Sequence, residues 1–277
     1  MIEGEGLGPS VDLHSHLVPG VDDGAGSVDD ALEGLKRMHA TGISVVVTTP
    51  HLEGSVTLLP ERFKVRVEEF DEAFQRLLVR MEDELPGIEI SRANEVALDH
   101  PEPDLTAPSL RLGEGQYVLV EWPRLRVPSS STRVLQRLSE QNVGLLLAHP
   151  ERYRLGDGAM ERMAEWKEAG ACFQVNYGSL VGAYGPDARR RGLELLARGW
   201  VDCLATDFHG RPALRLFISE AMEGILDRGE EREDSVEVWR LLTRTNPERI
   251  FRGEVPAPVR PLGRGEGIWQ RLTSLFR

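Results

Sequence analysis

The chain has 277 residues, of which 40% are hydrophobic and 28% are charged, as is usual for one large globular domain. Lys and Arg number 33 against 45 Asp and Glu, and the resulting net charge of −12 argues against nucleic acid as the main partner. No apolar stretch is long enough to cross a membrane, and the first residues lack the basic and apolar regions of a secretory signal, so we expect a cytoplasmic protein.

Seven apolar segments with little polar alternation are typical of strands buried on both faces of a sheet. These predicted strands span residues 11–14, 43–49, 88–94, 116–121, 143–148, 172–176 and 201–206. Amphipathic helices are predicted between them, namely one from the N-cap Ser27 to Gly42, and others over 60–85, 130–142, 158–169, 186–198, 212–228 and 234–245. Alternating strands and helices predict a parallel α/β sheet, and seven strands favour an irregular barrel.

The end of the chain has a different composition. Residues 1–252 are predicted to form the barrel domain, and the Gly- and Pro-rich residues 253–267 read as a linker. Residues 268–277 follow, with Ile268, Trp269, Leu272, Leu275 and Phe276 on one helical face. This amphipathic segment either packs back on the barrel or is partly disordered, or it makes peripheral contact with a membrane or a partner.

Side chains that bind metals stand at the ends of the apolar runs. Alternate residues of a strand point to the same side, so His14 and His16 can reach one ion, as can Asp207 and His209. The full set of candidate ligands is His14, His16, His51, Glu95, Glu121, His149, Asp207 and His209. In α/β barrels such residues meet at the C-terminal rim. His39 and His100 lie elsewhere and are expected to be solvated.

The donor types indicate which ions fit. Imidazole and carboxylate donors without a thiolate suit Mn, Fe or Zn better than calcium or a structural zinc. Eight ligands exceed the needs of one ion, so two or three ions are predicted. Cys172 and Cys203 read as buried free thiols, and neither opens a Cys-x5-Arg phosphate loop, because the sixth residue after each is Gly178 and His209.

These motifs, and their order along the chain, resemble those of a known protein family. Residues 12–24 read Asp-Leu-His-Ser-His-Leu-Val-Pro-Gly-Val-Asp-Asp-Gly, and the likeness continues in order through Thr48-Thr49-Pro50-His51, Asn94-Glu95-Val96, Val120-Glu121-Trp122-Pro123, Ala148-His149-Pro150-Glu151-Arg152-Tyr153, Gly178-Ser179-Leu180-Val181-Gly182 and Asn246-Pro247-Glu248. This pattern, over residues 10–252, resembles the PHP (polymerase and histidinol phosphatase) superfamily. Within it, the pattern looks most like the bacterial manganese-dependent protein-tyrosine phosphatases linked to capsule and exopolysaccharide synthesis.

The resemblance implies a distorted, TIM-like (β/α)7 barrel of the PHP fold, with a trinuclear site held by the eight candidate ligands. It also implies that Arg152 contacts the substrate phosphate. The family's usual Ser-Asp-Ala-His-Asn stands here as Thr206-Asp207-Phe208-His209-Gly210, so a bulky Phe208 replaces a small residue.

The expected reaction is hydrolysis of a phosphomonoester by a metal-bridged hydroxide that attacks phosphorus. The expected substrate is phosphotyrosine on the C-terminal tail of a bacterial tyrosine kinase that controls polysaccharide export. Arg211 is a second candidate for phosphate contact. Asp23 is a candidate proton donor, although support of the ligands or of a turn is the simpler role for Asp22 and Asp23. Two alternatives stay open: a small-molecule phosphatase such as one for histidinol phosphate, and a non-catalytic regulator that binds a phosphoprotein.

Overall fold

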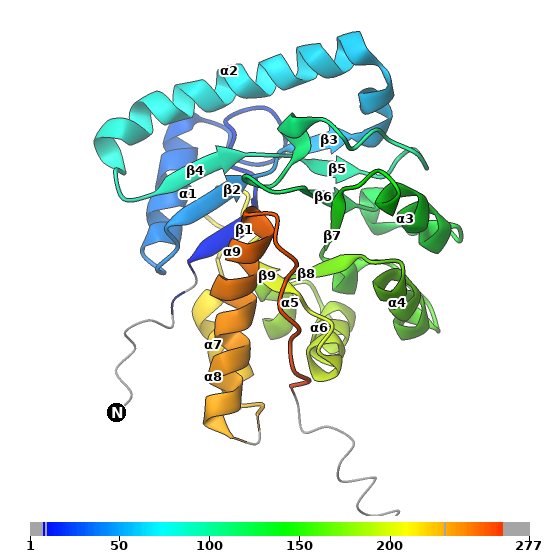
Figure 1. Ribbon diagram of the computed structural model, residues 1–277. Helices are drawn as coiled ribbons and strands as arrows, with labels where there is room; N and C mark the ends of the chain where they lie inside the picture. Colours follow the sequence, from blue (N-terminus) through cyan, green and yellow to red (C-terminus); the bar gives the residue numbers. More distant parts are fainter. Residues whose placement is uncertain (1–7, 9, 230, 263–277) are drawn as a thin grey trace, which may run out of the picture.

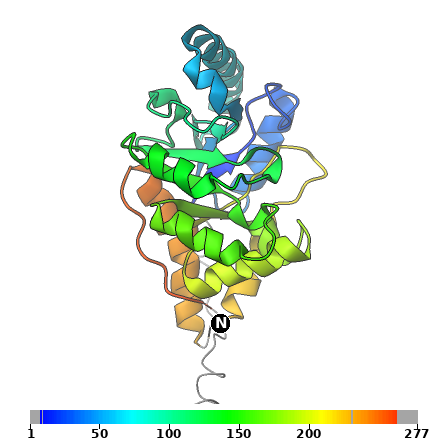
Figure 2. The ribbon, with the colours of Figure 1, turned by 90° about the vertical axis from the view of Figure 1, so that its right-hand side faces the viewer.

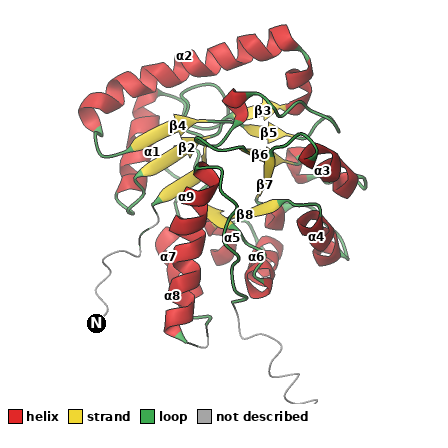
Figure 3. Ribbon diagram, in the orientation of Figure 1, coloured by secondary structure: helices red, strands yellow, loops and turns green. Residues whose placement is uncertain are grey.

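A computed structural model describes residue 8, residues 10–229 and residues 231–262. The chain is a mixed α/β fold in which strands of two parallel sheets are surrounded by helices (Figures 1, 2 and 3). The first sheet has the order β1 (Val11–Ser15), β2 (Val45–Thr48) and β4 (Glu89–Arg92). The second has the order β3 (His51–Glu53), β5 (Glu95–Ala97), β6 (Tyr117–Glu121), β7 (Gly144–Ala148), β8 (Cys172–Asn176) and β9 (Cys203–Ala205).

The chain passes from the first sheet to the second in two places. The sequence predicted single strands over 43–49 and 88–94, but β2 and β4 are each followed two residues later by a further short strand, β3 or β5. Pro50 has no N–H to donate to a ladder, and the Pro50 carbonyl accepts the Asn94 side-chain amide at 3.0 Å. His51 and Glu95 then pair in register at the start of the second sheet.

The N-terminal strand lies beside the segment that follows β9. The His16 N–H donates to the Phe208 carbonyl at 2.8 Å, and the Asp207 N–H donates to the His14 carbonyl at 2.9 Å. The buried Asp12 carboxylate accepts both the N–H and the hydroxyl of Thr206, each at 2.8 Å. Residues about 195 positions apart in the chain are therefore held together by backbone and side-chain hydrogen bonds.

The helices are α1 (Val28–His39), α2 (Pro60–Glu84), α3 (Ser131–Ser139), α4 (Ala159–Glu168), α5 (Tyr177–Val181), α6 (Pro186–Arg198), α7 (Ile218–Leu226), α8 (Arg232–Arg240) and α9 (Asn246–Phe251). Single turns are η1 (Gly54–Leu58), η2 (Pro108–Leu110), η3 (Pro123–Leu125), η4 (Pro150–Arg152) and η5 (Leu241–Thr245). Ser27 caps α1 as predicted, since its hydroxyl accepts the Asp30 N–H at 3.1 Å. The helix predicted over 212–228 begins only at Ile218, because Phe217 adopts a left-handed conformation with φ of +58°.

The strands are buried on both faces, which explains their unbroken apolar sequences. Along β6, Val118 and Val120 pack with the large cluster that includes Trp166, whereas Leu119 packs with a second cluster that includes Leu13 and Leu146. All of these side chains are buried. Polar side chains at the strand ends are therefore set in an apolar frame that holds them in place.

The start of the predicted linker runs along the outside of the body (Figures 1 and 2). The Asn246 side chain accepts the Ala257 N–H at 2.7 Å and donates to the Ala257 carbonyl at 2.9 Å. The Leu262 N–H donates to the Leu196 carbonyl at 2.9 Å, and Leu262 is buried. Residues 253–262 are thus packed on the domain, and we name them the C-terminal strap.

The remainder of the linker, residues 263–267, and the amphipathic segment 268–277 lie outside the described residues, as do residues 1–7. The domain boundaries and the membrane or partner contact of 268–277 stay predictions. No helix in the described part of the chain combines the length and the apolar character that crossing a bilayer requires.

Candidate metal centre

All eight predicted ligands come together at or just beyond strand ends. His14 lies in β1 and His16 follows it, Glu121 ends β6, and His149 follows β7. His51 and Glu95 begin β3 and β5, and Asp207 and His209 follow β9. Their donor atoms form four overlapping groups, within each of which all atoms lie within 4.8 Å of one another: His16, Asp23, His51 and His209; His14, Glu95 and His149; His14, His16 and Asp207; and His51, Glu95 and Glu121.

The Glu95 carboxylate is at the centre of the groups. Its Oε2 lies 3.3 Å from His14 Nε2, 3.4 Å from His16 Nε2 and 3.1 Å from His51 Nδ1. Within the described chain this buried oxygen has no hydrogen-bond partner, and neither does His149 Nδ1. Buried polar atoms without partners are rare in folded proteins, and a bound cation is one explanation for them.

The spacing of the donor atoms fits shared cations. Donors that each lie about 2.1 Å from one ion are about 3.0–3.4 Å apart at octahedral to tetrahedral angles. The three distances around Glu95 Oε2, from 3.1 to 3.4 Å, agree with this expectation. Nitrogen and carboxylate donors without thiolates also match the preferences of divalent first-row metals.

The electrostatics of the groups point the same way. Burial would raise the pKa of Glu95, but the imidazole of His14 and its neighbours hold that pKa well below its usual value. Burial, together with repulsion from Glu95, raises the pKa of Glu121 to about 8. Burial would lower the pKa of His14, yet Glu95 and Asp207 raise it to about 9. Bound protons therefore offset the negative charge of the clustered carboxylates. Metal ions bound at the same place would take over this role, and the protons would be released.

Three side chains orient the candidate ligands, namely Asp22, for which support of the ligands was an expected role, and Gln174 and Asn176, which we did not predict as functional. The Asp22 carboxylate lies 2.8 Å from His16 Nδ1, and Gln174 Oε1 lies 2.9 Å from His14 Nδ1. Asn176 Nδ2 donates to Asp207 Oδ2 at 2.8 Å. Such partners fix the ring orientation of metal-binding histidines. Gln174 and Asn176 alternate on β8, and two amides on one face of an apolar strand were the signal in the sequence.

Arg152 lies at the edge of the groups, at the end of η4. Its Nη1 donates to Asp207 Oδ2, and its guanidinium carbon lies 4.1 Å from the centre of the Tyr184 ring. Asp207 and other carboxylates raise its pKa against the effect of burial, so it stays cationic. Tyr184 is a further residue that the sequence patterns did not single out.

Asp23 and Arg211 meet on the exposed side of the site. Asp23 Oδ1 lies 3.5 Å from His51 Nε2 and 3.4 Å from His209 Nε2, which places it among the candidate ligand atoms. The exposed Arg211 donates to the backbone carbonyl of Asp23. The structure therefore brings both residues to the candidate site, although on its outer side.

With this geometry established, the comparisons with known proteins decide the family. Residues 10–252 match the family described as "Capsular polysaccharide synthesis, CpsB/CapC". This chain belongs to that family. The predicted resemblance to capsule-type phosphatases is thereby confirmed.

Two curated CpsB/CapC relatives illustrate the likeness. The chain is 28% identical to tyrosine-protein phosphatase YwqE of Bacillus subtilis, over 90% of this chain and 96% of the relative. It is 25% identical to the putative tyrosine-protein phosphatase CapC of Staphylococcus aureus, over 72% of this chain and 76% of the relative.

A solved structure supports the fold. A chain from the crystal structures of YwqE from Bacillus subtilis and CpsB from Streptococcus pneumoniae, described there as metal-dependent tyrosine phosphatases, matches with a TM-score of 0.69. The match covers 90% of this chain and 99% of the other at 22% identity.

Two candidate ligands of this CpsB/CapC protein have a strained backbone. His149 has φ of +37° and Asp207 has φ of +50°, in the left-handed region that residues other than Gly rarely adopt. Each such residue costs on the order of 1–3 kcal/mol, which the surrounding structure must offset. The Arg152 N–H bonds to the His149 carbonyl and the Asp207 N–H bonds to the His14 carbonyl, both at 2.9 Å. Pattern reading of the sequence could not have shown this strain.

The departure from the family pattern at Phe208 affects packing instead of the ligands. Phe208 is buried, and the Arg37 guanidinium carbon lies 5.0 Å from its ring centre. A methyl group at Gly34 would come within 3.1 Å of the same ring. Arg37 and Gly34 both belong to α1, so Phe208 packs on that helix. Neither His39, which is exposed, nor His100 joins a candidate metal group of the described residues.

Proposed function

We propose that this protein is a metal-dependent phosphomonoester hydrolase that removes phosphate from tyrosine residues. The observation that carries the proposal is the convergence of eight imidazole and carboxylate side chains, with the buried Glu95 among them and Arg152 at their edge. The chain belongs to a family whose curated relatives are named tyrosine-protein phosphatases, which identifies the substrate class.

Two or three divalent ions are the proposed cofactor, with Mn²⁺ as the first choice and Fe or Zn as alternatives. The four overlapping donor groups support more than one ion, because Glu95, His14, His16 and His51 each belong to two of them. When bound, such ions lower the pKa of a bound water and offset charge on the phosphoryl group.

The protein's own side chains would position the phosphate. We assign Arg152 to the non-bridging phosphate oxygens, since a planar guanidinium can donate two parallel hydrogen bonds to them. Arg211 is the second candidate for this contact. A tyrosyl oxygen leaves with a pKa of about 10, so it needs less proton assistance than an alkyl alcohol. We therefore assign Asp23 the role of a metal donor in the outer group with His51 and His209, and not the role of proton donor. Its position between their Nε2 atoms supports this choice.

We also propose that the two sheets form one distorted seven-stranded barrel with the site at its C-terminal rim. Counting β2 with β3 and β4 with β5, the strand orders give one continuous series from β1 to β9. The backbone bonds between β1 and the residues after β9 support its closure. Six of the eight candidate ligands lie at or just beyond the C-terminal ends of these strands, where catalytic residues of such barrels are found, and His51 and Glu95 directly follow the breaks within the other two.

The proposed substrate is the phosphotyrosine-bearing C-terminal tail of a bacterial tyrosine kinase that acts in capsule or exopolysaccharide production, in the cytoplasm. The family description and the names of the curated relatives support this choice. A tail that is accessible and unfolded suits a site whose outer residues Asp23 and Arg211 are exposed.

The test is phosphate release by Mn-loaded protein from a phosphotyrosine peptide, a phosphoserine peptide and histidinol phosphate. We expect turnover of the phosphotyrosine peptide to be fastest, to be lost in His14→Ala and to fall strongly in Arg152→Ala. His39→Ala and Arg154→Ala are matched controls, because these exposed residues lie outside the donor groups, and they should retain activity. Preference for histidinol phosphate would move the function to a small-molecule phosphatase, and metal binding without any turnover would favour a phosphoprotein-binding regulator.

A further inference from the structure

A hollow of about 530 Å³ lies immediately beyond the ligand Glu121. We name it the arginine hollow. It is lined by Leu98, Asp99, His100, Pro101, Trp122, Pro123, Arg124, Arg126, Val127, Pro128, Ser130 and Val134. Except for Val134, which lies in α3, these residues come from the loops that follow β5 and β6. Both strands carry predicted ligands, so the hollow adjoins the candidate metal centre.

Backbone contacts connect the hollow to the centre. The Leu98 N–H donates to the Glu121 carbonyl at 2.8 Å, and the Trp122 N–H donates to the Tyr153 hydroxyl at 3.2 Å. The Tyr153 ring in turn makes an edge contact with the ring of His149, with 5.9 Å between ring centres. The wall of the hollow therefore rests on two of the candidate ligands.

Arg124 and Arg126 give the hollow its charge. Both side chains are exposed, and among the described residues neither makes an ion pair or a side-chain hydrogen bond. Arg124 and Leu125 have φ of +55° and +57°, and the turn is held by the Arg154 N–H, which donates to the Leu125 carbonyl at 2.9 Å. The one carboxylate of the lining, Asp99, accepts hydrogen bonds from the N–H and the hydroxyl of Ser55. Neither guanidinium is therefore engaged by a carboxylate of the described residues.

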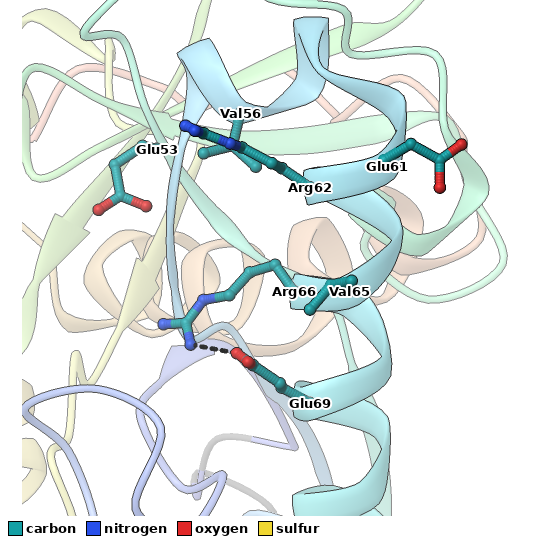
Figure 4. Close-up of a pocket in the computed structure, with 7 residues that line it drawn as sticks. All are labelled: Glu53, Val56, Glu61, Arg62, Val65, Arg66 and Glu69. Atoms are coloured by element: carbon teal, nitrogen blue, oxygen red, sulfur yellow. Dashed lines mark hydrogen bonds and ion pairs between the residues drawn. The ribbon is translucent and has the colours of Figure 1, made fainter.

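A second hollow beside the site differs in charge. It has a volume of about 450 Å³ and is lined by Glu53, Val56, Glu61, Arg62, Val65, Arg66 and Glu69 (Figure 4). Its carboxylates outnumber its two guanidinium groups. Arg66 is engaged by Glu69 at 2.9 Å and by the Val21 carbonyl at 3.0 Å. An anionic ligand is therefore better matched by the arginine hollow.

Resting on the proposed function, we propose that the arginine hollow binds anionic groups that flank the phosphotyrosine on the substrate chain, with Arg124 and Arg126 as the residues that select them. An extended chain advances by about 3.3–3.6 Å per residue, so neighbours a few positions from a phosphotyrosine at the centre can reach beyond Glu121. Charge complementarity then favours substrates that carry carboxylates or further phosphates there.

The test compares four substrates: a phosphotyrosine peptide with neutral flanks, the same peptide with Asp flanks, a doubly phosphorylated peptide, and p-nitrophenyl phosphate, which has no flanks. For the wild type we expect kcat/KM to be about twofold to thirtyfold higher for an anionic than for the neutral peptide, the range expected for two exposed ion pairs. The Asp and phosphate arms show which anion is preferred, and preference for either supports the proposal. The preference should decline with added salt.

The variants are Arg124→Glu and Arg126→Glu, singly and together, with Arg126→Gln as a milder change should the double variant fold poorly. They should remove the preference and leave turnover of p-nitrophenyl phosphate unchanged. Arg62→Glu is the matched control, since it makes the same charge change in the other hollow and should retain the preference. A wild type that does not distinguish the peptides, or an Arg126 variant that keeps the full preference, would overturn the proposal. Failure of the wild type to hydrolyse even p-nitrophenyl phosphate would instead reject the proposed function.

Discussion

Several candidate ligands are held in place by a neighbouring polar side chain. Asp22 holds three groups at once, because its carboxylate lies 2.8 Å from His16 Nδ1 and accepts the N–H groups of His51 at 3.1 Å and Gly24 at 2.9 Å. Burial opposes the charge of Asp22, but the hydrogen bond with His16 lowers its pKa to about 2. It is therefore an anion that orients one ligand and the backbone of another.

Asp22→Asn should weaken metal binding by about 10- to 100-fold, the usual cost of losing such an orienting partner. The readout is Mn²⁺ affinity by titration calorimetry, which does not depend on activity. Asp29→Asn serves as the control, because Asp29 is exposed and should leave the affinity unchanged. Equal affinities for the two variants would contradict the orienting role.

Tyr184 is expected to hold Arg152 in place for phosphate through the stacked ring. Loss of a cation–π contact of about 0.5–2 kcal/mol corresponds to a fall of about 2- to 30-fold in kcat/KM. Tyr184→Ala should show this fall with p-nitrophenyl phosphate, mainly in KM, whereas Tyr184→Phe keeps the ring face and should match the wild type. If the Phe variant is as impaired as the Ala variant, the hydroxyl and not the stacking is what matters.

The sequence allowed the convergence of the candidate ligands to be predicted, but not most of the side chains that support them. Histidines and carboxylates at strand ends form a pattern because strand geometry fixes where their side chains point. Asp22 comes from a loop, and Tyr184 reaches Arg152 only through tertiary packing. Neither position follows from local periodicity, so the sequence could at most suggest a supporting role for Asp22.

At the scale of elements, β9 buries Cys203, whereas Cys172 at the start of β8 is half-buried. Burial, followed by the nearby Asp202 carboxylate, raises the pKa of Cys172 to about 12, and burial raises that of Cys203 well above its usual value. Both thiols therefore stay protonated at neutral pH, and thiols react with alkylating agents through the thiolate.

Iodoacetamide at neutral pH should accordingly leave phosphatase activity intact and the folded protein unmodified, as judged by mass spectrometry. In denaturing urea both thiols should react, which controls for the reagent. Rapid inactivation of the folded protein would indicate a reactive cysteine and contradict the metal-based proposal.

The packing of α1 on the segment after β9 gives a prediction about stability. Phe208→Ala would remove a buried ring and should lower the free energy of unfolding by about 3–5 kcal/mol, measured by urea denaturation. Val79→Ala, at an exposed position, should change it by less than about 0.5 kcal/mol. Similar values for both variants would show that the contact with α1 is not a packed one.

Short elements were the ones that sequence patterns missed. β3 and β5 have three residues each, too few for a period to be recognised, and they follow longer strands that dominate the pattern. The start of α7 was misplaced because the apolar residues before Ile218 look helical although Phe217 does not adopt a helical backbone. The long strands and α2 were predicted well because burial imposes a sustained pattern on them.

At the scale of the whole molecule, the C-terminal strap packs on the outside of the domain. Asn246 is fully buried, and its side chain also donates to the Asp202 carbonyl at 2.9 Å. Gly199, with φ of +68°, lies under the strap where any side chain would meet the Val259 carbonyl. The composition of residues 253–262 indicated a linker, because Gly and Pro are typical of linkers. A Pro-rich segment can also pack on a domain without regular secondary structure, as this one does.

Asn246→Ala should release the strap, because it leaves buried backbone groups without partners at a cost of about 1–3 kcal/mol. Trypsin cleavage between the exposed Arg252 and Gly253, where the strap begins, should become faster and the midpoint of urea unfolding should fall. Glu254→Ala is the control, since its contact with Arg249 is largely exposed and should contribute little. Unchanged cleavage in Asn246→Ala would show that the strap is held by other contacts.

The hydrogen bonds between β1 and the residues after β9 also set an order of events during synthesis. Six of the eight candidate ligands lie at or before residue 149, and the last two lie at residues 207 and 209. At roughly 5–20 residues per second, a ribosome needs several seconds to add the intervening stretch. During that interval the growing chain holds most of the donors without the strand that completes their arrangement. The complete set of candidate donors is therefore available only after the first strand and the segment that follows β9 have met.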